Sequence, residues 1–285
     1  MIYTGNDFDA VYHDLCADLI NAPCVEVRSD KTRELVNVQL VLNKPRRRFL
    51  TAPSRNISMR YCMGELCWYL GGRQDLKSIA AYSKFWERVS DDGVLVNSAY
   101  GYRLFSALNE SGKTQLDYAF GCLKDDPYTR KAVMMITSPD DAHASKDNPC
   151  TIGMQFLVRG GALSAYTTMR SNDLWLGLPY DLPFFTLVQE ILYVMLKKRY
   201  AWLKLGTYTH TATSMHAYER NWPEVSKVSR DKPTITRDAP ELTTVDVDGW
   251  FDDLLTYERS KRHLVVYKDE SKKTEFQEWC KQFLD

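Results

Sequence analysis

Cys150 is the residue of this chain whose type and setting most favour nucleophilic chemistry. It follows Pro149 and comes just before Ile152 to Val158, an apolar stretch typical of a strand. Proline cannot donate a hydrogen bond to a sheet, so Pro149 marks where the strand begins, and a cysteine at that point can face a cleft. A lone cysteine is more often a small packed hydrophobic residue, and that alternative stays open for Cys150 by itself.

A second polar cluster, Met169-Arg170-Ser171-Asn172-Asp173, ends the next predicted strand. If residues 152–158 and 162–169 form a hairpin across Gly160-Gly161, Arg170 lies close to Cys150. An arginine there would lower the pKa of the thiol and could bind a phosphate through two N–H groups. A surface ion pair between Arg170 and Asp173 is the structural alternative.

Two further places in the sequence carry charge in unusual settings. Glu65 lies on a predicted helix among aromatic and thiol side chains, which would raise its pKa and allow proton transfer near neutral pH; a surface glutamate is the alternative. Arg130 and Lys131 enter a predicted buried strand, where they form either an anion clamp or solvated flanking charge.

Near the end of a later predicted strand, His216 and Tyr218 lie two residues apart and so face the same side, where they could hold sugar hydroxyl groups. His210 precedes them on the same strand. No third ligand has a spacing that would complete a zinc site with these histidines, so no metal is expected.

The elements that must position these residues are a mixture of helices and strands without regular βαβ alternation, which predicts an α+β fold in one catalytic domain over residues 1–285. Helical periodicity predicts helices over residues 7–22, 57–70 and 184–198. Strands are predicted over residues 35–42, 132–136, 152–158, 162–169 and 207–214. Residues 221–242 are expected to form a surface connection, followed by a short helix over 250–257, a strand over 263–267 and a helix from 272.

Composition limits the classes of partner. The 37 basic and 37 acidic side chains cancel, so neither nucleic acid nor a membrane is an expected partner. No apolar run reaches the roughly 18 residues that a membrane span needs, and residues 1–7 lack the features of a signal peptide. Seven cysteines without a CxxC pair indicate reduced thiols in a cytoplasm.

Taken together, these motifs resemble the thymidylate synthase family. The resemblance runs from about Asp30 to Tyr218, and its most specific part contains Pro149-Cys150, Arg170-Ser171-Asn172-Asp173 and Leu176-Gly177-Leu178-Pro179-Tyr180-Asp181, followed by His216-Ala217-Tyr218. It implies a two-layer α/β sandwich whose large mixed sheet forms the interface of a homodimer. Asn97-Ser98-Ala99-Tyr100-Gly101 and the Arg170 segment are similar to the deoxycytidylate and cytidylate hydroxymethylase branch.

The resemblance also implies roles for individual residues. Cys150 would be the nucleophile, with Glu65 as the carboxylate that manages protons. The nucleotide phosphate would be bound by Arg170 and Ser171, by Arg130 and Lys131 of the other subunit, and by Lys31, which stands where the family usually has an arginine. Substrate contacts would also come from Asn172, Asp173, His216 and Tyr218. Folate contacts would come from Trp86, Asp173 and Gly177.

Asp181 indicates the base. Methyl-forming members of the family have asparagine at this position, and its amide suits the N3–H and O4 edge of uracil. A protonated Asp181 suits cytosine, because its O–H can donate to N3 while the carboxyl accepts from the 4-amino group. An ionised Asp181 would face the lone pairs of uracil O4, a mismatch that discriminates strongly. Asp181 therefore indicates a cytosine nucleotide, and the choice between dCMP and CMP stays open.

The implied reaction begins when the Cys150 thiolate adds to ring C6, which makes C5 nucleophilic. C5 would take a one-carbon unit from the co-substrate 5,10-methylenetetrahydrofolate, and water would complete a hydroxymethyl group. Hydride in place of water would give a methyl group on dUMP or dCMP, which is one alternative. The others are a non-catalytic nucleotide-binding or RNA-binding relative, and a cysteine hydrolase that pairs Cys150 with His210 or His216.

Overall fold

The computed structural model describes residues 1–27, 30–232, 234–263, 267 and 273–285. By their internal contacts these residues form two compact units, each assembled from three stretches of the chain. Unit 1 contains residues 1–57, 150–190 and 202–239, and unit 2 contains residues 58–149, 191–201 and 240–285. The expectation of a single catalytic domain over residues 1–285 stays a prediction.

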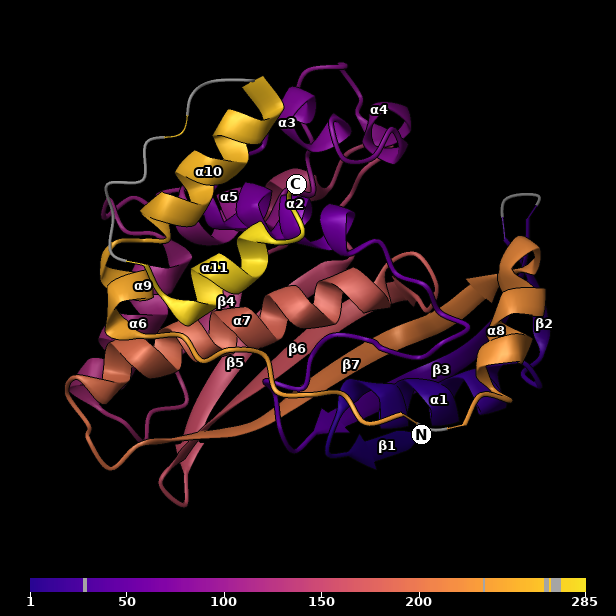
Figure 1. Cartoon of the computed structure of the whole chain (residues 1–285), viewed down its shortest axis with the longest axis horizontal. Helices are drawn as coiled ribbons and strands as arrows, with labels where there is room; N and C mark the ends of the chain where they lie inside the picture. The colour runs from indigo at the N-terminus through magenta and orange to yellow at the C-terminus, as the bar shows by residue number, and fades with distance from the viewer. Residues whose placement is uncertain (28–29, 233, 264–266, 268–272) are drawn as a thin grey trace. The chain divides into compact units, whose positions relative to one another are not determined.

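Unit 1 is built on a mixed sheet with its strands in the order β1-β3-β7-β6-β5 (Figure 1). Strand β2 pairs with the N-terminal part of β3, from Asp30 to Arg33. Neighbours β1/β3 and β6/β7 are parallel, whereas β3/β7 and β5/β6 are antiparallel. The strands are β1 Ile2–Gly5, β2 Cys24–Val27, β3 Asp30–Leu42, β5 Thr151–Arg159, β6 Ala162–Asp173 and β7 Lys204–Tyr218.

Strand β6 shows why the sequence forms this sheet. Leu163, Ala165, Thr167 and Met169 are buried, and the residues between them point to the other, more exposed face, as the period of two in a strand requires. The turn to β5 uses Gly160 and Gly161, whose positive φ angles of 56° and 77° suit glycine. The predicted hairpin is present.

Helices cover unit 1 on the face where β6 is buried. Helix α1 (Phe8–Leu19) begins after Asp7, whose side chain accepts from the N–H of Ala10, and packs against β1, β3 and α8 (Trp222–Val228) (Figure 1). The part of helix α7 (Leu178–Lys197) that belongs to unit 1 is tied to the sheet by Gln189. Its side-chain nitrogen donates to the carbonyl groups of Leu163, Gly206 and Thr207.

Unit 2 is mostly helical. Helix α2 (Met59–Leu70) is almost wholly buried and lies against α5, whose Gly101 permits the approach: a Cβ there would come within 2.1 Å of the Tyr69 carbonyl oxygen. The remaining elements of unit 2 are α3 Leu76–Ala80, α4 Phe85–Val89, α5 Tyr100–Phe105, α6 Gln115–Asp125, β4 Val133–Met135, the 3₁₀ turn η1 Pro139–Asp141, α9 Thr244–Asp248, α10 Asp252–His263 and α11 Glu275–Lys281. A second 3₁₀ turn, η2 Glu219–Asn221, belongs to unit 1.

Two sequence predictions need correction. Helix α7 begins at Leu178 and not at Phe184, because Pro179 lies in the first turn, where its missing N–H costs nothing, and Pro183 is tolerated inside the helix. Residues 221–242 are not merely a surface connection: they contain α8, started by Pro223, and bury Thr236. The strand predicted over 263–267 falls on residues 264–266, outside the described residues.

Among the helices that the structure describes, none has the length and apolarity of a membrane span.

Candidate active site

The hairpin of unit 1 places Cys150 beside Arg170. The backbone N–H of Arg170 donates to the Cys150 carbonyl group over 2.9 Å, at the point where β5 begins. Cys150 is half-buried, whereas burial raises the pKa of the thiols of Cys16, Cys62 and Cys67 and keeps them protonated. Among these four thiols, Cys150 is the one that is partly exposed, and it lies beside an arginine.

Asp181 lies in the first turn of α7 and is bound by Asn172 at the end of β6. The Asn172 amide nitrogen donates to Oδ2 of Asp181 over 2.7 Å. Asp181 is half-buried, and the loss of hydration around its carboxyl group raises its pKa to about 7. The hydrogen bond from Asn172 opposes that rise, and the charge of Asp173 adds to it. Near neutral pH, Asp181 can therefore be either a proton donor or an acceptor.

A chain of buried polar side chains continues behind Asn172. Oδ1 of Asn172 lies 3.0 Å from Nε2 of His210, and Nδ1 of that ring lies 3.0 Å from the Tyr208 hydroxyl group. Tyr208 in turn lies 3.0 Å from Oγ1 of Thr167. Burial lowers the pKa of His210 to about 3, so the ring is neutral. With both ring nitrogens engaged, His210 is poorly suited to act as the base of a cysteine hydrolase.

Gly177 lies against the Asn172–Asp181 pair. A Cβ at this position would come within 2.9 Å of Nδ2 of Asn172 and 3.1 Å of Oδ2 of Asp181. The hydrogen bond therefore leaves no room for a side chain at position 177. This close approach gives Gly177 a structural reason to be glycine, beside the folate contact expected from the sequence.

Asp173 holds the turn between β6 and α7. Its Oδ1 accepts the backbone N–H groups of Trp175, at 2.7 Å, and Leu176, at 2.9 Å. Burial raises the pKa of Asp173, while these N–H groups and the charges of His216 and Arg220 pull it down. One oxygen of the carboxylate is thus committed to the turn, and a ligand would use the other.

His216 and Tyr218 lie together near the end of β7, where a sugar could be held. Their rings meet edge to face, with centroids 5.4 Å apart. Nδ1 of His216 lies 3.4 Å from the hydroxyl of Ser214, which donates to the carboxylate of Glu34 on β3. In the sheet register His216 is the partner of Asp173 on β6. Ser214 and Glu34 were not predicted from the sequence, although Ser214 stands two residues before His216.

The exposed end of the same sheet carries the candidate phosphate ligands. Lys31 is an exposed residue of β3 opposite Glu26 on β2, and Arg170 is an exposed residue of β6. Arg220, which stands two residues after Tyr218, was not predicted from the sequence. Its guanidinium lies 4.3 Å from the centroid of the Tyr218 ring and 3.7 Å from a carboxylate oxygen of Asp30. The cation directly downstream of the H-x-Y pattern was the available signal.

In unit 2, Glu65 is buried on α2, which contradicts the surface alternative. The Tyr61 hydroxyl, one helical turn earlier, donates to Oε1 of Glu65 over 2.7 Å. The indole N–H of Trp86 donates to the same Tyr61 oxygen over 3.1 Å. Trp86, which was expected to contact folate, thus also supports the Glu65 carboxylate through Tyr61.

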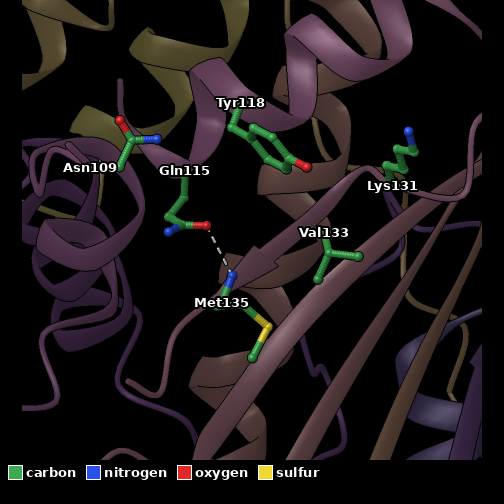
Figure 2. Close-up of a pocket in the computed structure, with 6 residues that line it drawn as sticks. All are labelled: Asn109, Gln115, Tyr118, Lys131, Val133 and Met135. Atoms are coloured by element: carbon green, nitrogen blue, oxygen red, sulfur yellow. Dashed lines mark hydrogen bonds between the residues drawn. The ribbon is translucent and has the colours of Figure 1, made fainter. Parts of the chain in front are cut away.

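Lys131 lines an open cavity of about 460 Å³ in unit 2, shown in Figure 2. Tyr118 lies on one wall, and the side chain of Gln115 is anchored to the backbone N–H of Met135 over 3.0 Å. Arg130 is an exposed neighbour of Lys131. Both cations are therefore accessible.

The described residues contain no group of three or more histidine, cysteine, aspartate or glutamate side chains that could hold a metal ion.

Comparison with known proteins gives a consistent picture. The family model of thymidylate synthase matches residues 10–274. Over 228 residues the chain is 29% identical to a deoxyuridylate hydroxymethyltransferase of Bacillus phage SP01, a match that covers 76% of this chain and 58% of that protein. A thymidylate synthase of Haloferax volcanii is 25% identical, with coverage of 54% and 49%. A thymidylate synthase of Bacillus subtilis subsp. natto is 24% identical, with coverage of 82% and 87%. The match thus spans about half the length of the first two relatives.

Proposed function

Because this chain belongs to the thymidylate synthase family and has its fold, a mixed sheet covered by helices, we propose that it hydroxymethylates C5 of a cytosine nucleotide, dCMP or CMP. The observation that carries the base preference is Asp181. Its carboxyl group is bound by Asn172 and has a pKa of about 7, so a protonated form is available to donate to cytosine N3. The same group can accept from the 4-amino group.

Cys150 would supply the nucleophile. Its thiolate adds to ring C6, a bond that places electron density on C5 and makes C5 reactive toward a one-carbon electrophile. Once C5 has bonded to the one-carbon unit, loss of the C5 proton would let tetrahydrofolate depart and leave an exocyclic methylene. Water would then add to that methylene carbon while the bond between C6 and Cys150 breaks, which releases the thiolate and restores the aromatic ring. Glu65, held by Tyr61, is the proposed carrier of these protons.

The other predicted residues would bind the substrate. Arg170, Ser171 and Lys31 are the proposed phosphate ligands of one subunit, and Arg130 and Lys131 those contributed by the second subunit of a homodimer. Arg130 and Lys131 are both exposed, which a role across a subunit interface requires. His216 and Tyr218 would contact the sugar, and Asn172 and Asp173 would complete the pocket around the base.

Methylenetetrahydrofolate, the co-substrate that this family uses, would supply the carbon. Asp173 fits a contact to it because one of its carboxylate oxygens is held rigidly by the turn and the other can accept an N–H of a heterocycle. Trp86 and Gly177 are the further proposed contacts. Gly177 offers its backbone without a side chain in the way.

A second candidate is hydroxymethylation of a uracil nucleotide. The phage SP01 relative, named as a deoxyuridylate hydroxymethyltransferase, favours it. In that case Asp181 would be ionised and would accept N3–H of uracil. Methylation of dUMP or dCMP differs from both candidates in the last step, where hydride replaces water.

One assay separates these functions. The protein is incubated with 5-tritiated dCMP, CMP or dUMP and methylenetetrahydrofolate, and tritium release and product mass are followed. Release from a cytosine nucleotide with a product heavier by CH2O supports the proposal and names the sugar. Release from dUMP alone contradicts the base preference, and a product heavier by CH2 contradicts the hydroxymethylation.

The matched control for the nucleophile is a second half-buried cysteine. Cys150→Ser should abolish tritium release from every substrate, because an alcohol at this position does not ionise near neutral pH. Cys122→Ser, which changes a cysteine of similar exposure on α6, should retain activity. Equal activity of the two variants would rule out covalent catalysis by Cys150.

A further inference from the structure

Arg220 lies just beyond β7, next to the residues that are expected to hold the sugar. It belongs to the 3₁₀ turn η2, which directly follows Tyr218. Its guanidinium lies over the Tyr218 ring, 4.3 Å from the ring centroid, and one of its nitrogens lies 3.7 Å from a carboxylate oxygen of Asp30 on β3. Contact with the ring face favours this position of the long side chain, so the guanidinium has a defined place at the end of the strand.

The charge of Arg220 extends to the candidate active site. It lowers the pKa of Asp173, whose burial acts in the opposite direction. The charge of His216, the proposed sugar contact opposite Asp173 in the sheet, lowers the same pKa. Arg220 therefore lies within electrostatic range of the side chains that are expected to surround the nucleotide. A sugar held by His216 and Tyr218 would carry its phosphate one carbon away from the ring.

The guanidinium also offers a geometry that the neighbouring candidate phosphate ligand lacks. Lys31, the residue after Asp30 on β3, carries an ammonium group, which acts as a point charge. The guanidinium of Arg220 is planar and presents its N–H groups as a fork, which can bind two oxygens of one phosphate in parallel. Arg220 is thus suited to complement Lys31 at this end of the sheet.

Asp30 is the partner of this guanidinium in the structure. Both side chains are largely open to solvent, with exposed fractions of 61% for Asp30 and 54% for Arg220. An exposed ion pair contributes little free energy, because water weakens the attraction and both side chains lose conformational freedom. A phosphate monoester carries about two negative charges and three acceptor oxygens, so it is a stronger partner for the same donors. A phosphate can therefore displace Asp30.

We infer that Arg220 is a further ligand of the 5′-phosphate of the substrate, and that Asp30 binds its guanidinium until the nucleotide displaces the carboxylate. The inference rests on the proposed function, because it takes a pyrimidine nucleoside monophosphate as the ligand. It does not depend on which base that nucleotide carries. It adds to the proposed phosphate ligands one arginine and one carboxylate that opposes binding.

Calorimetry with ligands that have or lack a phosphate tests the inference. Dissociation constants are measured for dCMP, CMP and dUMP and for the corresponding nucleosides. The proteins are the wild type, Arg220→Ala, Arg220→Lys, Asp30→Asn and the double variant Arg220→Ala with Asp30→Asn, all at one ionic strength, since salt screens exposed charges. Arg230→Ala, which removes another exposed arginine of unit 1, is the matched control, and melting temperatures check folding.

Arg220→Ala should weaken binding of the preferred nucleotide by about tenfold, the size of one hydrogen-bonding contact to a charged group, and binding of its nucleoside by less than about twofold. Arg220→Lys should lose about threefold, because the charge remains and the fork is lost. Asp30→Asn should strengthen nucleotide binding by about twofold to threefold, because the competing carboxylate is gone. Most of that gain should disappear in the Arg220→Ala background, since the two residues share one contact. Arg230→Ala should bind like the wild type.

An unchanged nucleotide affinity in folded Arg220→Ala would overturn the inference. An equal loss for nucleotide and nucleoside would also overturn it, because Arg220 would then act only through Tyr218. The same gain from Asp30→Asn with and without Arg220 would contradict the competition by Asp30. Where a nucleoside binds too weakly to measure, this coupling between Asp30 and Arg220 decides.

Two further arms separate the inference from other assignments. Binding of tetrahydrofolate is measured with the same variants, and a loss there with unchanged nucleotide affinity would assign Arg220 to the carboxylates of the folate and overturn the inference. A wild-type protein that prefers dUMP contradicts the proposed base, while the dependence of nucleotide binding on Arg220 still decides the inference. A wild-type protein that binds none of the nucleotides contradicts both.

Discussion

The hydroxyl of Tyr61 donates to Oε1 of Glu65 over 2.7 Å and itself accepts the indole N–H of Trp86. This bond holds a buried carboxylate that needs a defined orientation to move protons. Tyr61→Phe should therefore lower kcat by about tenfold to a hundredfold and leave nucleotide affinity nearly unchanged. This is less than the roughly 10²–10⁴-fold that general acid–base catalysis typically contributes, because Glu65 itself remains. Tyr128→Phe, which alters an exposed tyrosine of the same unit, is the control. Equal kcat values for the two variants would show that Glu65 does not depend on Tyr61.

Asp181→Asn should move the base preference from cytosine toward uracil. The amide cannot supply the acid proton that cytosine N3 requires, and it can accept from uracil N3–H while donating to O4. We expect a shift of at least about a hundredfold in the ratio of kcat/KM values, below the roughly 10⁴–10⁵-fold with which a hydrogen-bonding site can reject a mismatched analogue. Tritium release from dCMP, CMP and dUMP measures this ratio. An unaltered ratio would mean that another residue determines the base preference.

Asp181 should also make the stability of the protein depend on pH. Its folded pKa of about 7 lies above its ordinary value of 3.8, so between these values the folded state holds a proton that the unfolded state has lost. The contribution of Asp181 to stability therefore falls as pH rises from about 4 to about 7. With about 1.4 kcal/mol for each of about three pH units, the loss is at most about 4 kcal/mol, and less because Asp181 is half-buried. Urea unfolding of Asp181→Asn at pH 5 and pH 8 should show a smaller loss than that of the wild type.

His210 should make the stability depend on pH in the opposite direction. Its folded pKa of about 3 lies below its ordinary value of 6.5, so between these values the unfolded state binds a proton that the folded state does not bind. The stabilising contribution of neutral His210 is complete above pH 6.5 and is lost as pH falls toward 3. His210→Gln, which cannot titrate, should lose less stability than the wild type between pH 6.5 and pH 4.5 in the same unfolding experiment. Parallel curves would indicate that His210 titrates normally.

Gly177→Ala should damage the site without unfolding the protein. A Cβ at 2.9 Å from Nδ2 of Asn172 is too close, and the Asn172–Asp181 bond must lengthen to admit it. We expect a loss of about tenfold in kcat/KM for the cytosine nucleotide, comparable with one weakened hydrogen bond. Gly121→Ala, at a position on α6 where a Cβ meets nothing within 4 Å, is the matched control. Full activity of Gly177→Ala would show that the pair can relax.

The sequence predicted those helices and turns whose pattern of residues lies within one short stretch of the chain. The helices at residues 8–19 and 59–70, the hairpin turn at Gly160-Gly161 and the proximity of Cys150 and Arg170 all followed from periodicity and turn chemistry. The helices α3, α4 and α5 are only five or six residues long, too few turns for a clear period, and were not predicted. Helix α6 was not predicted either.

The polar partners behind the site could not be predicted in the same way. Tyr208 and His210 share one face of a strand, which was evident from their spacing, but their contact with Asn172 depends on the pairing of β6 with β7. That pairing is parallel and joins residues more than 40 positions apart, so no local pattern encodes it. Burial of Glu65 was expected from its aromatic neighbours, and Tyr61 was among them. The roles assigned to the individual site residues stay predictions.

The pairing of β6 with β7 also affects how base preference could be changed by engineering or by evolution. Thr167 is opposite His210 in the register. The side-chain hydrogen bonds that connect Thr167 with Asn172 cross from β6 to Tyr208 and His210 on β7 and then return to β6. A change at position 181 alone would leave four side chains arranged for an acid that is no longer there. A single substitution should thus give an enzyme that is poor with both bases, and an efficient change of substrate should require replacements on two strands and a helix together.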